Sequence, residues 1–336
     1  MKSQHSPIIT SSGKAELRSR WASALAIVAS FTAAGALLAA SPGDTELCPA
    51  CRETTQLTFE AEIAGANSEL LLGRAKARTL PTTAERQAAR NAAQGVFMES
   101  QLELRARKRA RLAICRMLNE CRYNPVIDPA NFMTPAEIAA NPNPYFPLIP
   151  GTLLRYQTTG PGVSEIAEFR VTRETRVILG VTCIEVRDTV FIGGVAIEDT
   201  RDWYAQDRDG NTWYFGELSV SFVNGQISGL EGSWEAGVDG AKPGFVMKVS
   251  PQVGEVYRQE YLIGEAEDSA RIEALNESVT VPTGSYTNCR KIAEFFPFEP
   301  DSVEAPSNKF YAPNIGFVLQ LKPGGEREEL IAIEHF

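Results

Sequence analysis

Two aromatic-rich segments on either side of a turn limit the folds open to this chain. Trp203-Tyr204 and Trp213-Tyr214-Phe215 flank the stretch Asp207-Arg-Asp-Gly-Asn211. Asp, Gly and Asn tolerate the left-handed backbone angles of tight turns, so the pattern predicts a β-hairpin. An isolated two-stranded hairpin is marginally stable in water, and this one therefore needs a larger sheet to join.

The chain from residue 145 onward continues the same pattern. Short runs of alternating polar and apolar residues are bounded by Gly, Pro and Asn, and Gly193-Gly194 and Asn224-Gly225 are typical hairpin turns. Many short strands with tight turns indicate an antiparallel fold. We therefore predict a mainly β protein, in which residues 145–336 form an antiparallel curved sheet or half-barrel.

Landmarks in this β-domain recur at a nearly constant offset, which predicts an internal duplication. Gly151 and Tyr156 correspond to Gly254 and Tyr257, and Cys183 corresponds to Cys289. The strings Trp203-Tyr-Ala and Phe310-Tyr-Ala correspond in the same way. We expect the paired strands to superpose, with their aromatic side chains directed into a shared interior.

The region before the sheet has a different character and predicts a helical hairpin over residues 41–122. Apolar residues at helical spacing favour a helix over 53–72, with Gly73 as its stop. Thr82 and Glu85 form a capping-box pattern that starts a second helix over about 84–119. Five positive charges between Arg105 and Arg111 are typical of a solvated helix surface, or of attraction to an anionic lipid or polysaccharide of the envelope, or to the acidic β-domain of the same chain. Residues 123–144 are rich in Pro and predict a linker.

The start of the chain has the features of an export signal over residues 1–40. Basic residues precede an apolar run from Trp21 to Ala40, and turn formers follow from Ser41. We expect cleavage near Ser41 and a secreted or periplasmic protein. A retained transmembrane anchor is the alternative, and it is the one case in which we expect a membrane partner.

The cysteines fit an oxidising compartment. Antiparallel helices bring Cys48 and Cys51 near Cys115 and Cys121, so we predict disulfides between these two pairs, with the partners unassigned. A redox pair between Cys48 and Cys51 is the alternative. The state of Cys183 and Cys289 is left open.

Composition excludes several classes of function. The net charge is −9, and residues 126–336 carry −15 because residues 1–125 carry +6, which argues against a nucleic-acid partner. The histidines are His5 and His335, so no internal histidine can serve as the base of a nucleophilic triad. No dinucleotide or phosphate-loop motif is present, and Asp207-x-Asp-x-Asn211 lacks the glycine and the final acid of a calcium loop. We predict no metal and no cofactor.

Carboxylates and aromatics remain as candidates for a site. Asp202 and Glu217 lie on neighbouring predicted strands and are suited to acid–base work, or form ordinary surface. A Gly-rich stretch from Gly232 to Gly244 is expected to be a long loop that either binds a ligand or covers the end of the sheet. The predicted ligand-binding residues are Asp202, Trp203, Trp213, Glu217, Trp234, Glu235 and Asp239.

The strings Asp202-Trp-Tyr-Ala-Gln-Asp-Arg-Asp-Gly-Asn-Thr-Trp-Tyr-Phe-Gly-Glu217 and Gly232-Ser-Trp-Glu-Ala-Gly-Val-Asp-Gly-Ala-Lys-Pro-Gly244 are also informative. They resemble a group of uncharacterised exported bacterial β-rich proteins, over about residues 143–321. The repeat landmarks are similar, more weakly, to periplasmic half-barrels of the lipoprotein-carrier type. These resemblances imply an exported β fold and no particular activity.

Our expectation is an exported, non-enzymatic protein that binds an apolar or polymeric ligand on a concave aromatic face. A secreted carboxylate-dependent hydrolase or lyase is the first alternative. An envelope interaction protein without a small ligand is the second. Two carboxyls about 5–9 Å apart in a deep pocket favour the enzyme.

Overall fold

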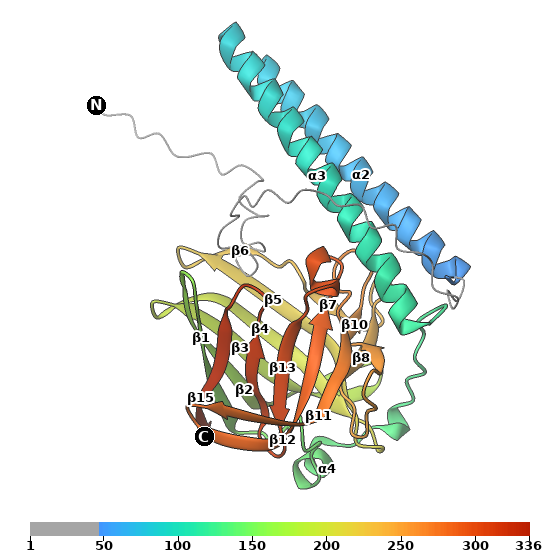
Figure 1. Ribbon diagram of the computed structural model, residues 1–336, viewed down its shortest axis with the longest axis vertical. Helices are drawn as coiled ribbons and strands as arrows, with labels where there is room; N and C mark the ends of the chain where they lie inside the picture. The colour runs from blue at the N-terminus through green and yellow to red at the C-terminus, as the bar shows by residue number, and fades with distance from the viewer. Residues whose placement is uncertain (1–46) are drawn as a thin grey trace, which may run out of the picture.

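The computed structural model describes residues 47–336, and the predicted signal segment 1–40 lies outside this range (Figure 1). A helical hairpin precedes one large antiparallel sheet that is nearly closed into a barrel, so the predicted mainly β fold is confirmed. The hairpin reaches well beyond the barrel, and only one end of it meets the strands (Figure 1).

The hairpin consists of α2 (Pro49–Arg78) and α3 (Thr83–Leu118). Thr82 and Glu85 form the predicted capping box at the start of α3. The predicted stop at Gly73 was wrong, because α2 continues for another turn to Arg78. A Cβ atom at Gly73 would lie 2.8 Å from the Cβ of Ala93 on α3, so this glycine allows the two helices to approach closely.

Two disulfides tie the open end of the hairpin. Cys48 is bonded to Cys121 and Cys51 to Cys115, with Cα–Cα distances of 5.1 and 6.5 Å. The predicted pairing across the two helices is therefore confirmed, and the redox pair within residues 48–51 is not formed. Disulfides of this kind persist in oxidising compartments. Cys183 and Cys289 are free and buried.

The predicted linker over 123–144 contains two short helices, η1 (Pro129–Asn131) and α4 (Pro135–Ala140), and it packs along the outside of the sheet. Phe132 lies edge-on to Trp213 and Phe215, with ring centroids 6.0 and 5.5 Å away. The Asn143 amide side chain donates to the carbonyl of Gly210 at 2.8 Å. We call residues 123–148 the strap, because they pack against one side of the sheet and cover one of its ends.

Each strand of the first half pairs with its neighbour along the chain. These strands are β1 (Thr152–Gly160), β2 (Val163–Ile178), β3 (Val181–Ile192), β4 (Val195–Gln206) and β5 (Thr212–Val223), with β6 (Gln226–Gly229), β7 (Trp234–Glu235) and β8 (Lys242–Met247) following. The second half contains β9 (Val256–Arg258), β10 (Glu260–Tyr261), β11 (Ser269–Val281), β12 (Gly284–Phe295), β13 (Ser307–Ala312), β14 (Gly316–Leu321) and β15 (Arg327–His335), with η2 (Pro300–Val303) before β13. The sheet order is β10-β8-β5-β4-β3-β2-β1-β15-β14-β13-β12-β11-β9, and β6 and β7 also pair with β5.

One residue connects the two edge strands of this sheet. β9 is the edge strand beside β11, β10 is the edge strand beside β8, and Gln259 alone separates them along the chain. A Cβ atom at Gly244 of β8 would lie 2.4 Å from the carbonyl oxygen of Arg258. The predicted curved sheet therefore curls further than a half-barrel, and residues 256–261 bridge its edges.

The two halves repeat the same pairing pattern. The amide of Gly151 donates to Val171 at 2.9 Å, and that of Gly254 donates to Ile272 at 2.8 Å. Tyr204 lies opposite the residue that follows Cys183, and Tyr311 lies opposite the residue that follows Cys289. A register shift occurs at Trp203/Tyr204 in one half and at Phe310/Tyr311 in the other. These correspondences are those expected of a duplicated unit.

The glycines of the hairpin provide a matched test of its packing. Gly95→Ala should stabilise the hairpin by about 0.5–1 kcal/mol, because an added Cβ there meets nothing within 4 Å and alanine favours the helix. Gly73→Ala should lose that gain or destabilise the hairpin, because its Cβ would collide with Ala93. Thermal unfolding followed by the helical circular dichroism signal measures both, and equal stabilisation by the two substitutions would contradict the packing.

Candidate functional site

Carboxyl and phenol groups line the inner face of the barrel. Asp202 and Tyr204 occupy alternate positions on β4 and are both buried, and alternate residues of a strand point to the same face. The same side receives groups from other strands around the barrel. They are the carboxyls of Asp188, Glu217, Glu260, Asp268, Glu294 and Glu328, and the phenols of Tyr156, Tyr214, Tyr257 and Tyr311.

Electrostatic interactions across the sheet show that these groups share one interior. Tyr311 on β13 raises the pKa of Tyr204 on β4, as a lesser cause beside burial and nearby carboxylates. Lys309, also on β13, acts on Asp188 of β3. β13 is separated from β3 and β4 by several strands, so such groups approach one another only because the sheet curves around them.

Acidic groups outnumber basic groups in this interior. Lys309 donates to Glu294 at 2.7 Å, and these two side chains keep 29% and 16% of their surface exposed. Arg290 lies at the end covered by the strap, where it donates to the carbonyl of Val249 at 2.7 Å and stacks on Tyr145. Because Lys309 and Glu294 retain accessible surface, water reaches part of the inner face. The remaining carboxyls far outnumber the cations.

Asp202 and Glu217 meet through one phenol. The Oη of Tyr214 lies 2.5 Å from Oδ1 of Asp202 and 2.8 Å from Oε2 of Glu217. A phenol has one proton to donate, so at most one carboxylate receives it and the other must carry its own proton to bond with Oη. Burial, followed by the charge of Glu217, raises the pKa of Asp202 well above its usual value. This shift favours the proton on Asp202.

Trp234 belongs to the same inner face. It stands on β7 opposite Glu217, its Nε1 donates to Glu260 at 2.6 Å, and its ring lies edge-on to Tyr214. The expectation that the stretch from Gly232 to Gly244 is a long loop was wrong in part, because it contains β7 and the start of β8. Trp234 is buried, with 4% of its surface exposed, because it covers the Asp202–Glu217 pair.

Among the buried polar atoms without a hydrogen-bond partner, two belong to the carboxyl and phenol groups of this face. They are the Oη of Tyr257, whose side chain is buried with 5% exposed, and Oδ1 of Asp188. Burial, followed by the charges of Glu328 and Glu198, raises the pKa of Asp188 to about 8. Burial, followed by Glu294, raises the pKa of Asp268 to about 7. Buried polar groups are normally satisfied, so these two atoms have unused capacity to bind a ligand.

The other predicted site residues lie elsewhere. Trp203 faces outward beneath the guanidinium of Arg176, which is 4.4 Å from the ring centroid. Trp213 lies under the strap and donates to Asp207 at 2.8 Å. Glu235 forms an ion pair with Arg176, and Asp239 is exposed in a turn with φ of 50°. The structure thus brings together Asp202, Glu217 and Trp234 and leaves the remaining four outside.

Sequence reasoning missed most of the inward carboxyls. Charged residues occur on both faces of β4, at Glu198-Asp199 and Arg201-Asp202. The alternation of polar and apolar residues therefore did not show which carboxyls face inward. The repeat did contain a signal, because its landmarks Tyr156, Tyr204, Tyr257 and Tyr311 all face the interior. The acids two residues away from these tyrosines are Asp202 and Glu255, so such a search misses Asp188 and Glu328.

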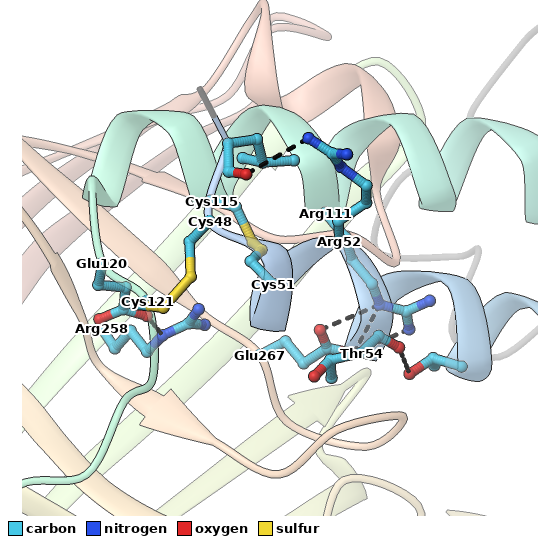
Figure 2. The surroundings of a disulfide bond; sticks show 12 residues. Cys48, Cys51, Arg52, Thr54, Arg111, Cys115, Glu120, Cys121, Arg258 and Glu267 are labelled. Carbon is cyan, nitrogen blue, oxygen red and sulfur yellow. Dashed lines mark hydrogen bonds and ion pairs between the residues drawn. A yellow bond between two sulfur atoms is a disulfide. The ribbon is translucent and has the colours of Figure 1, made fainter. Parts of the chain in front are cut away.

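A recess lies where the hairpin meets the barrel (Figure 2). This cavity of about 290 Å³ is lined by residues from both disulfides and by charged groups. Arg111 donates to Glu267 at 2.8 Å and to Glu62 at 3.0 Å, and Arg258 pairs with Glu120. Most of these charges are already used in holding the hairpin to the barrel. Arg111 of the predicted basic surface is among them, whereas Arg107 pairs with Glu103 of its own helix.

Comparison with family models, with curated proteins and with solved structures found no match. The resemblance to exported bacterial β-rich proteins therefore stays a prediction. Within residues 47–336, no helix is long and apolar enough to cross a membrane. In the same range, no three or more His, Cys, Asp or Glu side chains are grouped closely enough to hold a metal ion.

The raised pKa values predict an unusual pH dependence of stability. Asp188 and Asp268 keep their protons to about pH 8 and about pH 7 in the folded state, whereas the ordinary Asp value is 3.8. The folded state therefore binds more protons than the unfolded state above about pH 4, and its stability falls as pH rises toward about 8. Each such carboxyl contributes at most about 1.4 kcal/mol per pH unit.

Calorimetric unfolding between about pH 5 and about pH 9 measures this effect. The melting temperature should fall across the range, and Asp188→Asn should make the fall shallower because the amide does not titrate. Carboxyls with lowered pKa, such as Glu255, titrate below this range and do not oppose the trend. A melting temperature that rises with pH would show that the inner carboxyls are ionised.

Proposed function

We propose that this protein is an exported, non-enzymatic binding protein whose ligand lies against the inner face of the barrel. The observation that carries the proposal is the unpartnered Oη of Tyr257, buried among carboxyl and phenol groups. A buried hydroxyl without a partner costs about 1–3 kcal/mol, which a bound ligand recovers. The two disulfides support residence in an oxidising compartment, and we propose that this compartment is the periplasm or the exterior of the cell.

The chemistry of the inner face favours a polar ligand over an apolar one. Asp188, Asp202 and Glu260 present oxygen atoms there, and Lys309 presents an ammonium group. Tyrosine rings add flat surfaces that stack against a ligand and hydroxyls that bond to it. A polar polymer fragment fits this combination, whereas an apolar chain would leave these groups desolvated without partners.

Binding is favoured over catalysis by the state of the carboxyls. Burial raises the pKa of Asp202 and of Glu260 well above their usual values, which favours their protonated forms. A neutral acid donates a hydrogen bond well, but it is not a general base or a nucleophile. With no internal histidine in the sequence, the described residues offer no histidine base beside these acids.

Removal of one hydroxyl tests the proposal. Tyr257→Phe should weaken ligand binding about tenfold while leaving the melting temperature of the free protein unchanged or slightly higher, because the lost hydroxyl has no partner in the protein. Tyr261→Phe is the matched control, since Tyr261 borders the recess at the hairpin and not the inner face. The ligands to be compared are neutral oligosaccharides, polyamines and phospholipid vesicles, with binding measured by calorimetry.

The outcome separates the possible functions. A ligand that binds wild type and Tyr261→Phe but binds Tyr257→Phe weakly supports the inner face as the site. Equal binding to all three proteins places the ligand elsewhere and contradicts the proposal. Absence of binding by every class favours an envelope interaction protein without a small ligand.

One observation favours a second candidate, a carboxylate-dependent hydrolase or lyase. Tyr214 joins a protonated Asp202 to Glu217, and Glu217 keeps some exposed surface. Glycoside hydrolysis uses two neighbouring carboxyl groups, one as the acid and the other as the base or nucleophile. Release of reducing ends from oligosaccharides by the wild type, lost in both Asp202→Asn and Glu217→Gln, would establish this activity in place of simple binding.

A further inference from the structure

One face of α2 carries an exposed row of uncharged residues. Leu57 and Leu71 keep 58% and 63% of their surface exposed, and Leu57 also borders the recess at the junction with the barrel. Both belong to a set spaced alternately by four and three positions, which keeps every member on one side of a helix. The set is Leu57, Ala61, Ala64, Ser68, Leu71 and Ala75, and all six are exposed. We call it the α2 stripe, and it runs for about 27 Å at a rise of about 1.5 Å per residue.

The α2 stripe lies on the side of α2 opposite α3. Leu70 and Ala77 of α2 are buried, and Gly73 is the point at which α2 approaches α3 closely. At the junction, Arg111 of α3 donates to Glu267 of the barrel at 2.8 Å. Figure 1 shows α2 on the side of α3 that is turned away from the strands. The stripe is therefore open to a partner that approaches from outside the hairpin.

The order of large and small residues along the stripe matches the same stripe in the antiparallel direction. In two antiparallel α2 helices related by a two-fold axis level with residue 66, each stripe residue faces a different stripe residue of the other copy. The facing pairs are Leu57 with the partner's Ala75, Ala61 with the partner's Leu71, and Ala64 with the partner's Ser68. Each leucine meets an alanine, so large side chains fill the space that small ones leave.

Charges beside the stripe favour the same arrangement. Glu60 and Arg74 are exposed and lie along one edge of it. Within the hairpin they bond to neutral side chains, since Glu60 accepts from Gln56 at 2.6 Å and Arg74 donates to Gln94 at 2.8 Å. In the antiparallel pair each Glu60 lies beside the partner's Arg74, which gives two ion pairs across the two-fold axis. In a parallel pair the partner residue beside Glu60 is Gly65, so only the antiparallel pair matches these charges.

We propose that the α2 stripe is a docking surface for a second copy of this chain, and that the two copies form a symmetric dimer through antiparallel α2 helices. The inference uses no residue of the inner face, so it goes beyond the proposed function and does not depend on it. Each barrel meets only one end of its own hairpin (Figure 1). The antiparallel contact therefore places the two barrels at opposite ends of a four-helix assembly.

Sedimentation velocity over a range of protein concentrations tests the docking surface. The wild type should show a monomer–dimer equilibrium, and Leu71→Glu should weaken dimerisation about tenfold or more, because the dimer would bury a carboxylate against an alanine. Leu102→Glu is the matched control, since Leu102 is a 68% exposed leucine on α3, away from the stripe. It should dimerise as the wild type does. Both leucines are exposed in the single chain, so neither variant should lower the helical circular dichroism signal.

Exchange of the two charges tests the register. Glu60→Arg and Arg74→Glu should each weaken dimerisation, because each places like charges side by side across the axis. The double variant should recover dimerisation close to that of the wild type, because it restores both ion pairs with their signs reversed. Such a recovery identifies Glu60 and Arg74 as facing one another in the dimer.

Cross-linking tests the direction of the two helices. A disulfide needs Cα atoms within about 7 Å of one another. In the antiparallel pair Ala64 faces the partner's Ser68, so a mixture of Ala64→Cys and Ser68→Cys should cross-link under mild oxidation. Either variant alone should cross-link little, because residue 64 does not face the partner's residue 64. A parallel pair predicts the reverse result.

Three results would overturn the inference. A protein that remains monomeric up to about 1 mM does not bind its own copy with useful affinity. A dimer that Leu71→Glu and Leu102→Glu affect equally, or not at all, uses another surface. Cross-linking of each cysteine variant with itself, but not in the mixture, shows a different arrangement of the helices. Dimerisation that depends on Leu71, recovers on charge exchange and cross-links only in the mixture supports the antiparallel dimer.

Discussion

Closure of the sheet at Gln259 is the constraint on which the rest of the structure depends. β9 and β10 are consecutive in the chain and lie at opposite edges of the sheet, so one residue joins the two edges. Gly244 makes this possible, because its hydrogen leaves room for the backbone of Arg258 at a distance that no Cβ would allow. Closure turns one face of every strand toward a common interior, and that is what forces carboxyls from distant strands together.

The helical hairpin strengthens this closure from outside. Arg258 of β9 pairs with Glu120 at the end of α3, and Arg111 of α3 bonds to Glu267, just before β11. The disulfide between Cys48 and Cys121 lies beside these contacts (Figure 2). Removal of one partner from a buried ion pair strongly destabilises a protein. These pairs therefore hold the hairpin to Glu267 and to residues 256–261, which bridge the edges of the sheet. The other end of the hairpin does not contact the barrel and does not contribute to this junction.

The fold could be predicted further than the site. Tight turns and alternating strands predicted the antiparallel sheet, and helix length predicted disulfides between the two pairs of cysteines but not the individual partners. Both predictions follow from local geometry. Gly73 was misinterpreted as the end of the helix. Its role is to let α2 approach Ala93 of α3 closely, and the local sequence does not show that contact. The site depends on which face of each strand turns inward. That is decided by closure between Arg258 and Gly244, two residues whose contact no local pattern reveals.

The central claim is that the inner face is a polar surface with unfilled bonding capacity. A high-resolution crystal structure of the unliganded protein near pH 7 tests it most directly. Our account predicts an ordered water or a small bound molecule within hydrogen-bond distance of Oη of Tyr257 and of Oδ1 of Asp188. A dry interior, in which these two atoms bond directly to other side chains, would contradict it.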